Sequence, residues 1–449
     1  MPSTFKRLSL CLALACAATL LTVACSQSDP QSATAGAGGT PKAHIAWDWT
    51  GIIGTGQSLA VGARAPQVAS TTQPYHNMML SKGSLAWPVD PNAPELKLVP
   101  LIEPAGRKAN GYPNAWPGNL DGETPHSAMG NAITALSQAQ FNRDLISIHT
   151  EVGENGQGMK YIKKNPDKDP RNVNGHAFEG SLVETKAIAR LAKAAGKTFG
   201  VGAITVTHGE SDSGSANYDE MLHQLWKDYN TDLPPITGQT EKILMIVSQQ
   251  NAYNGSPSTL AIWRAGDKFP TDIVCSGPKY QYPSPDALHL TTEGYRQLGE
   301  KYGEVYFERV VLGHDWRPLE PTKVTHEGKT LTVQFHVPVG PLVWDDVLEN
   351  PHNSVAEWKN AKGFEVNAGR TRVAIESAEI KGDSVVLTCA TDPGAGARVS
   401  YALTGERTMS KPYNGFGRWG LLRDSDPFKG AGTGKVQPNY AVAFDMTAP

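Results

Sequence analysis

Three short polar segments, far apart in the sequence, contain the residue types that hydrolytic chemistry requires. The first is Gly54-Thr55-Gly56-Gln57-Ser58, where small residues precede a serine whose hydroxyl could act as a nucleophile. The second is Asp286-Ala287-Leu288-His289, where a carboxylate three residues before an imidazole could orient its ring and stabilise its protonated form. The third is Thr207-His208-Gly209-Glu210-Ser211-Asp212, a run of polar groups. Each segment alone also has a structural interpretation, as a helix cap, a turn or a histidine at a helix start.

Predicted strands and helices place these segments at the ends of regular elements. A strand over residues 46–53, closed by Gly54-Thr55-Gly56, precedes Ser58, and a strand over residues 199–207 precedes the third segment. A long helix over residues 291–311 follows His289. Because the carboxyl ends of parallel strands meet at one edge of a sheet, we expect the three segments to converge at that edge.

The surrounding region alternates between apolar runs and helical patterns. Further strands are predicted over residues 145–152, 243–248 and 272–276, and further helices over residues 128–141, 182–195 and 218–229. Strands that alternate with helices pair in parallel through crossover connections. The stretch 60–122 is rich in Pro and Asn and contains Trp87 and Trp116, which indicates a long excursion over the carboxyl edge of the sheet.

The pattern changes after residue 314. Short strands are predicted within residues 324–337, 363–366, 373–380, 385–389 and 398–402, and Lys381-Gly382-Asp383 is typical of a hairpin turn. The sequence therefore predicts an α/β fold with two domains. Residues 44–313 are expected to form a three-layer α/β/α domain with a parallel sheet, and residues 314–449 a β-sandwich-like accessory domain.

The N-terminal residues have the pattern of a secretory signal. Lys6 and Arg7 precede an apolar run over residues 8–23, and Thr22-Val23-Ala24-Cys25 resembles the lipobox of bacterial lipoproteins. We therefore predict a signal peptide over residues 1–25, a flexible linker over residues 26–43 and export to the bacterial cell envelope. The protein would be anchored by a lipid on Cys25; the alternative is a plain secretory signal cut nearby, which leaves a periplasmic protein.

Charge and cysteine content narrow the classes of partner and cofactor. The chain has 449 residues, with 41 basic and 44 acidic side chains, a net charge of -3 and no basic stripe, which argues against a nucleic-acid partner. Of its five cysteines, only Cys275 and Cys389 fall in the predicted domains. The sequence contains no cluster of Cys and His residues with the spacing of a metal site. The two thiols are interpreted as buried and free, with a bridge between them as the alternative.

The three segments together resemble those of a known family. Gly-Gln-Ser at 56–58, Gly-Glu-Ser-Asp at 209–212 and Asp-x-x-His at 286–289 are similar, in this order, to the motifs of the SGNH hydrolases, and more narrowly of the sialate O-acetylesterase-type carbohydrate esterases. Residues 290–299 and the second domain also resemble that family. The resemblance implies a flavodoxin-like first domain and no metal or cofactor.

The resemblance also implies a role for each candidate residue. Ser58 would be the nucleophile, His289 the general base and acid, and Asp286 its orienting partner. The family's oxyanion donors correspond to the Ser58 amide, to Gly153 with Gly156 as the alternative, and to His208, which stands where the subgroup usually has glutamine. The residues assigned to substrate binding are Gln57, Glu210 and Asn155.

The predicted activity is removal of O-acetyl groups from an acetylated glycan by a carboxylic ester hydrolase with a Ser-His-Asp triad. Three alternatives remain open. The same triad could transfer the acyl group to a second sugar, the protein could be a non-catalytic glycan-binding lipoprotein, or it could be a lipase or arylesterase with an apolar acyl pocket.

Overall fold

The computed structural model describes residues 47–83, 90–105, 122–165, 174–251, 255–286, 288–348, 360–403 and 419–449. The predicted signal segment with Cys25, the linker 26–43, Trp87 and Trp116 lie outside the described residues. In the part of the chain that is described, no helix combines the length and apolar character needed to cross a bilayer.

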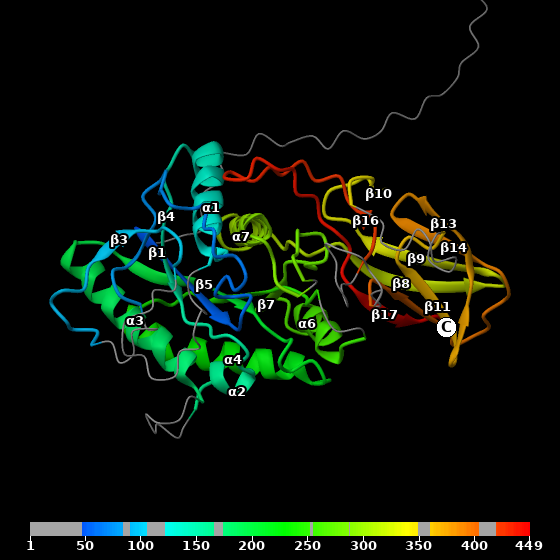
Figure 1. Cartoon of the computed structure of the whole chain (residues 1–449), viewed down its shortest axis with the longest axis horizontal. Helices are drawn as coiled ribbons and strands as arrows, with labels where there is room; N and C mark the ends of the chain where they lie inside the picture. The colour runs from blue at the N-terminus through cyan, green and yellow to red at the C-terminus, as the bar shows by residue number, and fades with distance from the viewer. Residues whose placement is uncertain are drawn as a thin grey trace, which may run out of the picture. The chain divides into compact units, whose positions relative to one another are not determined.

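A central sheet of seven strands, in the order β3-β2-β4-β1-β5-β6-β7, forms the middle layer of the first region (Figure 1). Its strands are β1 (Trp49–Gly56), β2 (Met78–Leu80), β3 (Leu98–Pro100), β4 (Ile146–Glu151), β5 (Phe199–Thr207), β6 (Leu244–Val247) and β7 (Ile273–Cys275). All neighbours pair in parallel except β2 and β3, which are antiparallel. The α/β prediction is confirmed, but the sheet is mixed. The three-residue strands β2 and β3 are too short to give a periodic signal within 60–122.

The strand order identifies where a ligand site belongs. Without the short edge strands β2 and β3, the order of the sheet is β4-β1-β5-β6-β7, which is the flavodoxin-like order 2-1-3-4-5. The chain places β4 on one side of β1 and then crosses to place β5 on the other side, and sheets of this kind bind ligands beyond the carboxyl ends of the strands at such a point. Ser58 follows β1 and Glu210 follows β5, so both lie at this switch point.

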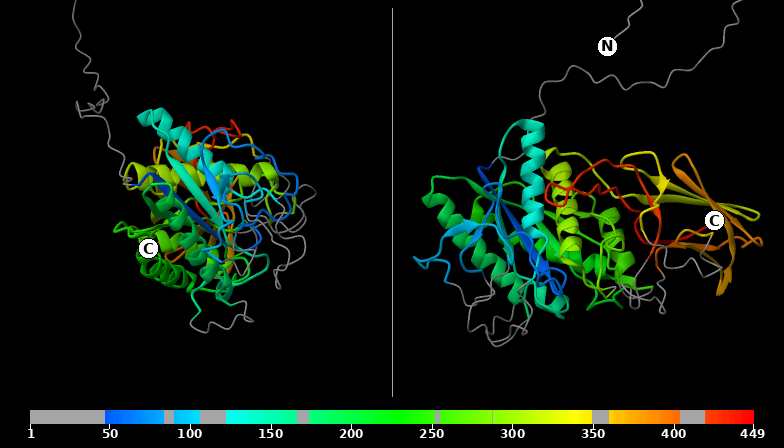
Figure 2. Two further views of the ribbon diagram at one scale, coloured as in Figure 1. Left: turned by 90° about the vertical axis from the view of Figure 1, so that its left-hand side faces the viewer. Right: turned by 45° about the horizontal axis from the view of Figure 1, so that its top comes forward.

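Helices cover both faces of the sheet (Figure 2). The longer ones are α1 (His126–Phe141), α3 (His176–Ala194), α4 (Tyr218–Asp232), α6 (Pro257–Lys268) and α7 (Thr292–Tyr306), with short α2 (Met159–Ile162) and α5 (Pro234–Thr237). Apolar residues of α1 and α7 share one core with one face of the sheet, and those of α3, α4 and α6 share another with the opposite face. Three layers follow from these two cores, as predicted.

Predicted and observed elements differ mainly at their ends. The strand over residues 199–207 is confirmed with the same bounds, whereas the long helix over residues 291–311 ends at Tyr306 and continues as a π-helical turn, Phe307–Val311. The prediction of a turn at Gly54-Thr55-Gly56 is wrong, because these residues belong to β1. They pair with Thr205, Val206 and Thr207 of β5. The helix α6 was not predicted.

The C-terminal region consists of antiparallel strands. One sheet has the order β13-β14-β9-β8, another β12-β11-β15-β17, and two short strands pair separately as β10 and β16. Their bounds are β8 (Glu320–Glu327), β9 (Thr330–His336), β10 (Val343–Trp344), β11 (Phe364–Ala368), β12 (Thr371–Val373), β13 (Ile375–Lys381), β14 (Ser384–Cys389), β15 (Arg398–Tyr401), β16 (Leu422–Arg423) and β17 (Phe444–Thr447). Apolar side chains from both four-stranded sheets share one core, as in a sandwich. The predicted hairpin turn joins β13 to β14, with Gly382 at φ 60°.

Two buried charged side chains of α7 bind the C-terminal segment. The carboxylate of Glu300 accepts hydrogen bonds from the backbone and hydroxyl groups of Thr433. The ammonium of Lys301 donates to Asn439 at 3.0 Å and to Glu304 at 2.5 Å. Because α7 begins three residues after His289, this docking also supports the element that carries the histidine loop.

Glu304 makes the stability of this docked segment depend on pH. Burial raises the pKa of Glu304 to about 8 from its ordinary 4.5; Lys301 lowers it in part and Asp426 raises it further. Between these values the unfolded chain loses a proton that the folded chain keeps, so stability is lost as pH rises. Between pH 5 and pH 8, wild type should therefore lose free energy of unfolding that Glu304→Gln keeps. In urea unfolding at these two pH values, we expect this difference between variant and wild type to grow by about 2 to 4 kcal/mol in favour of Glu304→Gln. Glu327→Gln, at an exposed strand end, is the control and should show no such gain.

Cys275 and Cys389 are both buried with free thiols, as interpreted from the sequence. Burial raises the pKa of Cys275 to about 12, so its thiol stays protonated at neutral pH. A protonated thiol is a poor nucleophile and a poor metal ligand, which leaves Cys275 a packing role.

Candidate active site

The turn after β1 holds Ser58 at the sheet edge. Gly56 adopts φ 144°, and a Cβ there would lie 2.2 Å from the carbonyl oxygen of Thr207, so the close approach of β1 to β5 requires glycine. A hydrogen-bonded turn then begins, with Ala60 N donating to Gln57 O and Ala63 N to Ser58 O. Among the described residues, neither the hydroxyl nor the amide of Ser58 has a hydrogen-bond partner. Both groups therefore remain available to a substrate.

Asp286 and His289 form the pair that the sequence predicted. His289 Nδ1 lies 2.9 Å from Asp286 Oδ2, and Asp286 Oδ1 accepts from the amides of Leu288 and His289. Burial alone would raise the pKa of Asp286, but the hydrogen bonds from His289 and Leu288 outweigh it and lower the pKa to about 2. Asp286 is therefore ionised at neutral pH and fixes Nδ1 of His289 as the protonated nitrogen. Nε2 has no partner among the described residues.

A buried chain of polar side chains ties together the loops that follow β1, β5 and β7. Gln57 Nε2 donates to Glu210 Oε2 at 3.0 Å, and the amide of Ser211 donates to Gln57 Oε1 at 3.1 Å. The other oxygen of Glu210 lies 3.4 Å from Lys279 Nζ, in an ion pair whose side chains are 2% and 0% exposed. Lys279 lies in the loop after β7 that continues to Asp286 and His289. The first and third of the predicted segments are therefore in contact, and the ion pair connects them to the loop that continues to Asp286 and His289.

Further contacts bring the serine turn to the histidine loop. Leu59 and Leu290, the residues that follow Ser58 and His289, are both fully buried in the same apolar core. Tyr295 Oη in α7 donates to the carbonyl of Ala63 at 2.9 Å. The two candidate catalytic residues are thus flanked by segments that contact each other.

The last link of the triad is not formed. Within the described part of the chain, no hydrogen bond joins Ser58 Oγ to His289 Nε2. Catalytic hydrogen bonds are often long before substrate binds and tighten in the complex, so the arrangement remains compatible with a Ser-His-Asp triad. The assignment of Ser58, His289 and Asp286 as catalytic residues stays a prediction.

Gly153 lies close to the serine turn, but its amide is engaged. A Cβ on Gly153 would come 3.1 Å from Gly56 N and 2.9 Å from Ala60 Cβ. The amide of Gly153 donates to Glu151 Oε1 at 2.5 Å, so it does not point to a substrate oxygen in this structure. Gly156, the alternative, is exposed at φ 72°, and its amide has no partner in the described residues.

His208 has no free ring nitrogen for an oxyanion. The ring is buried; Nε2 donates to the carbonyl of Gln157 at 2.9 Å and Nδ1 contacts the hydroxyl of Tyr218. Burial is the largest cause that lowers the pKa of His208, which favours a neutral ring. A neutral ring with both nitrogens bonded joins the β5 loop to the loop after β4. Its predicted oxyanion role lacks a donor here.

The three residues predicted to bind substrate differ in their surroundings. Gln57 and Glu210 are 3% and 5% exposed and bonded to each other, so their polar atoms hold loops together. Asn155 is half-buried on the loop after β4, and its side chain makes no hydrogen bond with the described residues. Of the three, Asn155 alone presents a free amide.

Three residues that lie beneath the candidate site were not predicted from the sequence: Lys279, His126 and Glu151. Lys279 comes four residues after β7 ends, and Glu151 is the last residue of β4. A charged residue at the carboxyl end of a predicted strand, or in the loop directly after it, is the signal that could have indicated both. His126, at the start of α1, carries no comparable signal.

Removing the charge of Lys279 should strongly destabilise the Gln57–Glu210–Lys279 chain that connects the loops after β1, β5 and β7. In Lys279→Met, the carboxylate of Glu210 would be left buried without its cation, which typically costs about 3 to 5 kcal/mol. We expect urea unfolding to show this loss and Lys279→Met/Glu210→Gln to recover most of it, since glutamine still accepts from Gln57. Full stability of the single variant would show that the ion pair does not hold the loops.

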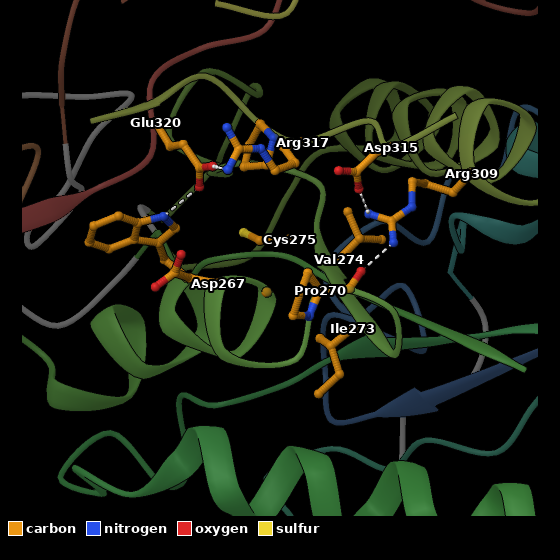
Figure 3. Close-up of a pocket in the computed structure, with 12 residues that line it drawn as sticks. Asp267, Pro270, Ile273, Val274, Cys275, Arg309, Asp315, Arg317 and Glu320 are labelled. Carbon is orange, nitrogen blue, oxygen red and sulfur yellow. Dashed lines mark hydrogen bonds and ion pairs between the residues drawn. The ribbon is translucent and has the colours of Figure 1, made fainter. Parts of the chain in front are cut away.

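A cavity of about 210 Å³ lies away from these residues (Figure 3). It is lined by residues of α6, of β7, of the π-helical turn after α7 and of the segment that leads into β8, and its arginines pair with Asp315 and Glu320. None of Ser58, Asp286 and His289 lines it. The candidate site is therefore the carboxyl edge of the sheet rather than this cavity.

Comparison with known proteins gives a likeness of fold. No family model matches the chain, and no curated protein matches it. A carbohydrate acetylesterase from Xanthomonas citri, XAC1771, is 14% identical with a TM-score of 0.52, over 88% of this chain and 80% of that chain. NanS is 12% identical with a TM-score of 0.35, over 59% and 98%. Est24, a carbohydrate acetylesterase from Sinorhizobium meliloti, is 12% identical with a TM-score of 0.29, over 57% and 96%. The match to XAC1771 shows a likeness of fold over most of both chains.

Proposed function

We propose that this chain is a serine ester hydrolase that removes O-acetyl groups from carbohydrate, with Ser58, His289 and Asp286 as its triad. One observation carries the proposal. The Gln57–Glu210–Lys279 chain joins the loop of Ser58 to the loop of the Asp286–His289 pair at the switch point of the sheet. A hydroxyl without a partner and an oriented imidazole on adjoining loops are the parts that acyl transfer requires.

The chemistry follows from these groups. Ser58 Oγ attacks the ester carbonyl carbon while His289 Nε2 accepts the hydroxyl proton, and Asp286 stabilises the imidazolium. The free amide of Ser58 donates to the oxyanion of the tetrahedral intermediate. The carbon–oxygen bond to the sugar then breaks, and the sugar oxygen takes the proton from His289. Water, deprotonated by His289, then attacks the acyl carbon. The bond to Ser58 Oγ breaks, acetate leaves, and His289 returns the proton to Ser58 Oγ.

The substrate class rests on two supports. The motifs at 56–58, 209–212 and 286–289 resemble those of carbohydrate esterases, and XAC1771, which has this fold, is a carbohydrate acetylesterase. Asn155 supplies one free amide beside the serine turn, and amides are suited to sugar hydroxyls. Acetylated glycan is therefore the proposed substrate, and no metal or cofactor takes part in the proposed steps.

Product analysis tests the proposal. Wild type is incubated with O-acetylated neutral polysaccharide, with p-nitrophenyl acetate and with p-nitrophenyl octanoate, and released acid is measured. We expect acetate from both acetyl substrates and at least about tenfold slower octanoate release. An added deacetylated glycan distinguishes transfer, because a transferase would form acetylated acceptor instead of free acetate. Faster release of octanoate than of acetate would indicate a lipase. If no substrate were hydrolysed, the proposed hydrolase function would be wrong and a glycan-binding function would be favoured.

We also propose that the protein is exported and carries a lipid on Cys25. The proposal rests on the signal pattern at residues 6–25 of the sequence. Labelling with a radioactive fatty acid in a bacterial host should mark wild type and leave Cys25→Ser unlabelled. Equal labelling of both proteins would contradict the anchor.

A further inference from the structure

A chain of buried side chains runs from Asn77 to the loop after β4, and its first hydrogen bonds have a fixed direction. The amide of Ser147 donates to Asn77 Oδ1 at 2.9 Å, which establishes that this atom is the oxygen. Ser147 Oγ also lies 2.9 Å from Asn77 Oδ1. Because an amide oxygen only accepts, the hydroxyl of Ser147 must donate its hydrogen to Asn77.

The direction of these bonds sets the protonation of His149. Its Nε2 lies 2.8 Å from Ser147 Oγ, whose hydrogen is already committed, so Nε2 carries a hydrogen and donates it. The pKa of His149 lies well below its ordinary value. Burial is the larger cause, and the electrostatic effect of His126 is the smaller one. His149 is therefore neutral, and its Nδ1 is a bare acceptor.

The next bond sets the protonation of His126. The two Nδ1 atoms of His126 and His149 are 2.9 Å apart, so His126 Nδ1 must supply the hydrogen. On its other side, His126 Nε2 lies 2.9 Å from Glu151 Oε2. A nitrogen lone pair and a carboxylate oxygen without a hydrogen between them would repel. One further proton must therefore lie between His126 and Glu151.

This shared proton makes the pair neutral overall, which suits its burial. The side chains of His126 and Glu151 are 2% and 1% exposed. The pair consists either of imidazolium and carboxylate or of imidazole and carboxylic acid, and both have zero net charge. Two further acids face this region: Glu103, which His126 affects electrostatically and whose carboxylate accepts from the amide of Ser127, and Glu123, which affects Glu103 electrostatically. Burial is the main cause that raises the pKa of Glu103.

The pair lies directly under the candidate active site. A Cβ on Gly54 would be 1.9 Å from His126 Nε2 and 2.3 Å from Glu151 Oε2, so the pair packs against the backbone of β1. The other oxygen of Glu151 accepts from the amide of Gly153. On either side of that bond, Val152 N donates to Gly54 O and Glu154 N donates to Gly56 O. Three consecutive amides thus attach the loop after β4 to β1 and to Glu151.

We propose that His126 and Glu151 are positioning residues that share one proton and hold the loop 152–156 against the Ser58 turn. The inference rests on the proposed function and adds to it a pair that lies outside the triad. The polar atoms of His126 and Glu151 are all bonded within the protein, so neither side chain offers a group to substrate. Their effect passes through Gly153, which packs against Gly56 and Ala60 at the start of the serine turn.

Glutamine at position 151 gives a sharp test. Its Nε2 would donate to His126 Nε2 without any added proton, and its Oε1 would still accept from Gly153. We therefore expect Glu151→Gln to keep kcat for p-nitrophenyl acetate within about threefold of wild type. Glu151→Ala removes both bonds, and we expect its kcat to fall about 10- to 100-fold with KM changed less than threefold. Glu95→Ala, at an exposed carboxylate, is the control and should match wild type.

Hydrogen exchange of the peptide covering residues 150–158, measured by mass spectrometry, separates this inference from the hydrolase assignment. We expect about tenfold faster exchange in Glu151→Ala and wild-type exchange in Glu151→Gln. Should Glu151→Ala not fold, Glu151→Asp takes its place, because the shorter carboxylate cannot reach both partners. Unchanged exchange in Glu151→Ala, or an equal loss of kcat in Glu151→Gln and Glu151→Ala, would overturn the proposal. If the exchange pattern holds but wild type hydrolyses no ester, the proposed function alone fails.

Discussion

Ser58→Ala is expected to lower kcat for acetate release by about 10³- to 10⁶-fold, with little change in KM. The hydroxyl is the only group at this edge proposed to attack the ester, so its loss removes the covalent step. Residual activity would come from the oxyanion donor and from substrate binding alone. Steady-state kinetics with p-nitrophenyl acetate and with acetylated polysaccharide measure the change.

Two controls make the Ser58 result interpretable. Ser58 Oγ has no hydrogen-bond partner among the described residues, so Ser58→Ala should unfold at the same urea concentration as wild type. Ser211→Ala changes an exposed hydroxyl on the neighbouring loop and should keep wild-type kcat. Wild-type turnover by Ser58→Ala would remove the serine mechanism and favour a glycan-binding role or a different nucleophile.

Gly54→Ala is expected to reduce the free energy of unfolding by at least about 3 kcal/mol. The added methyl group would lie 1.9 Å from His126 Nε2 and 2.3 Å from Glu151 Oε2, inside van der Waals contact. Either β1 or the buried pair must move, and movement of the pair breaks hydrogen bonds that have no replacement in the core. Urea unfolding measures the loss.

A glycine in open surroundings provides the matched control for Gly54. A Cβ on Gly214 would meet no atom within 4 Å, and its φ is not in the left-handed region. Gly214→Ala should therefore change the free energy of unfolding by less than about 0.5 kcal/mol. If Gly54→Ala were equally mild, the contact between β1 and the His126–Glu151 pair would be looser than the distances indicate.

The local parts of the candidate site follow from the sequence. Asp286 and His289 are three residues apart in one turn, so their contact depends mainly on local backbone geometry and could be predicted. The strand 199–207 is a long apolar run, and its carboxyl end placed His208 and Glu210 at the sheet edge. The order of strands and helices was also sufficient to predict the α/β class, whereas β2 and β3 were too short to give a signal.

Contacts between distant segments were decided by the tertiary structure alone. His208 was expected to face substrate, but Tyr218 and Gln157 occupy both nitrogens of its ring. The contacts that connect Gln57 through Glu210 to Lys279 form because β5 lies next to β1 in the sheet. Sequence periodicity does not specify this order of strands.

The sequence by itself determined which groups stand at the ends of the strands, because hydrophobic periodicity and turn residues are local properties. Only the tertiary structure decided which of those groups face each other across the sheet edge. The direction of a hydrogen bond, and hence the proton that His126 shares with Glu151, depends on every neighbour in the chain of bonds. Those neighbours come from separate strands and helices that meet only when the sheet is assembled.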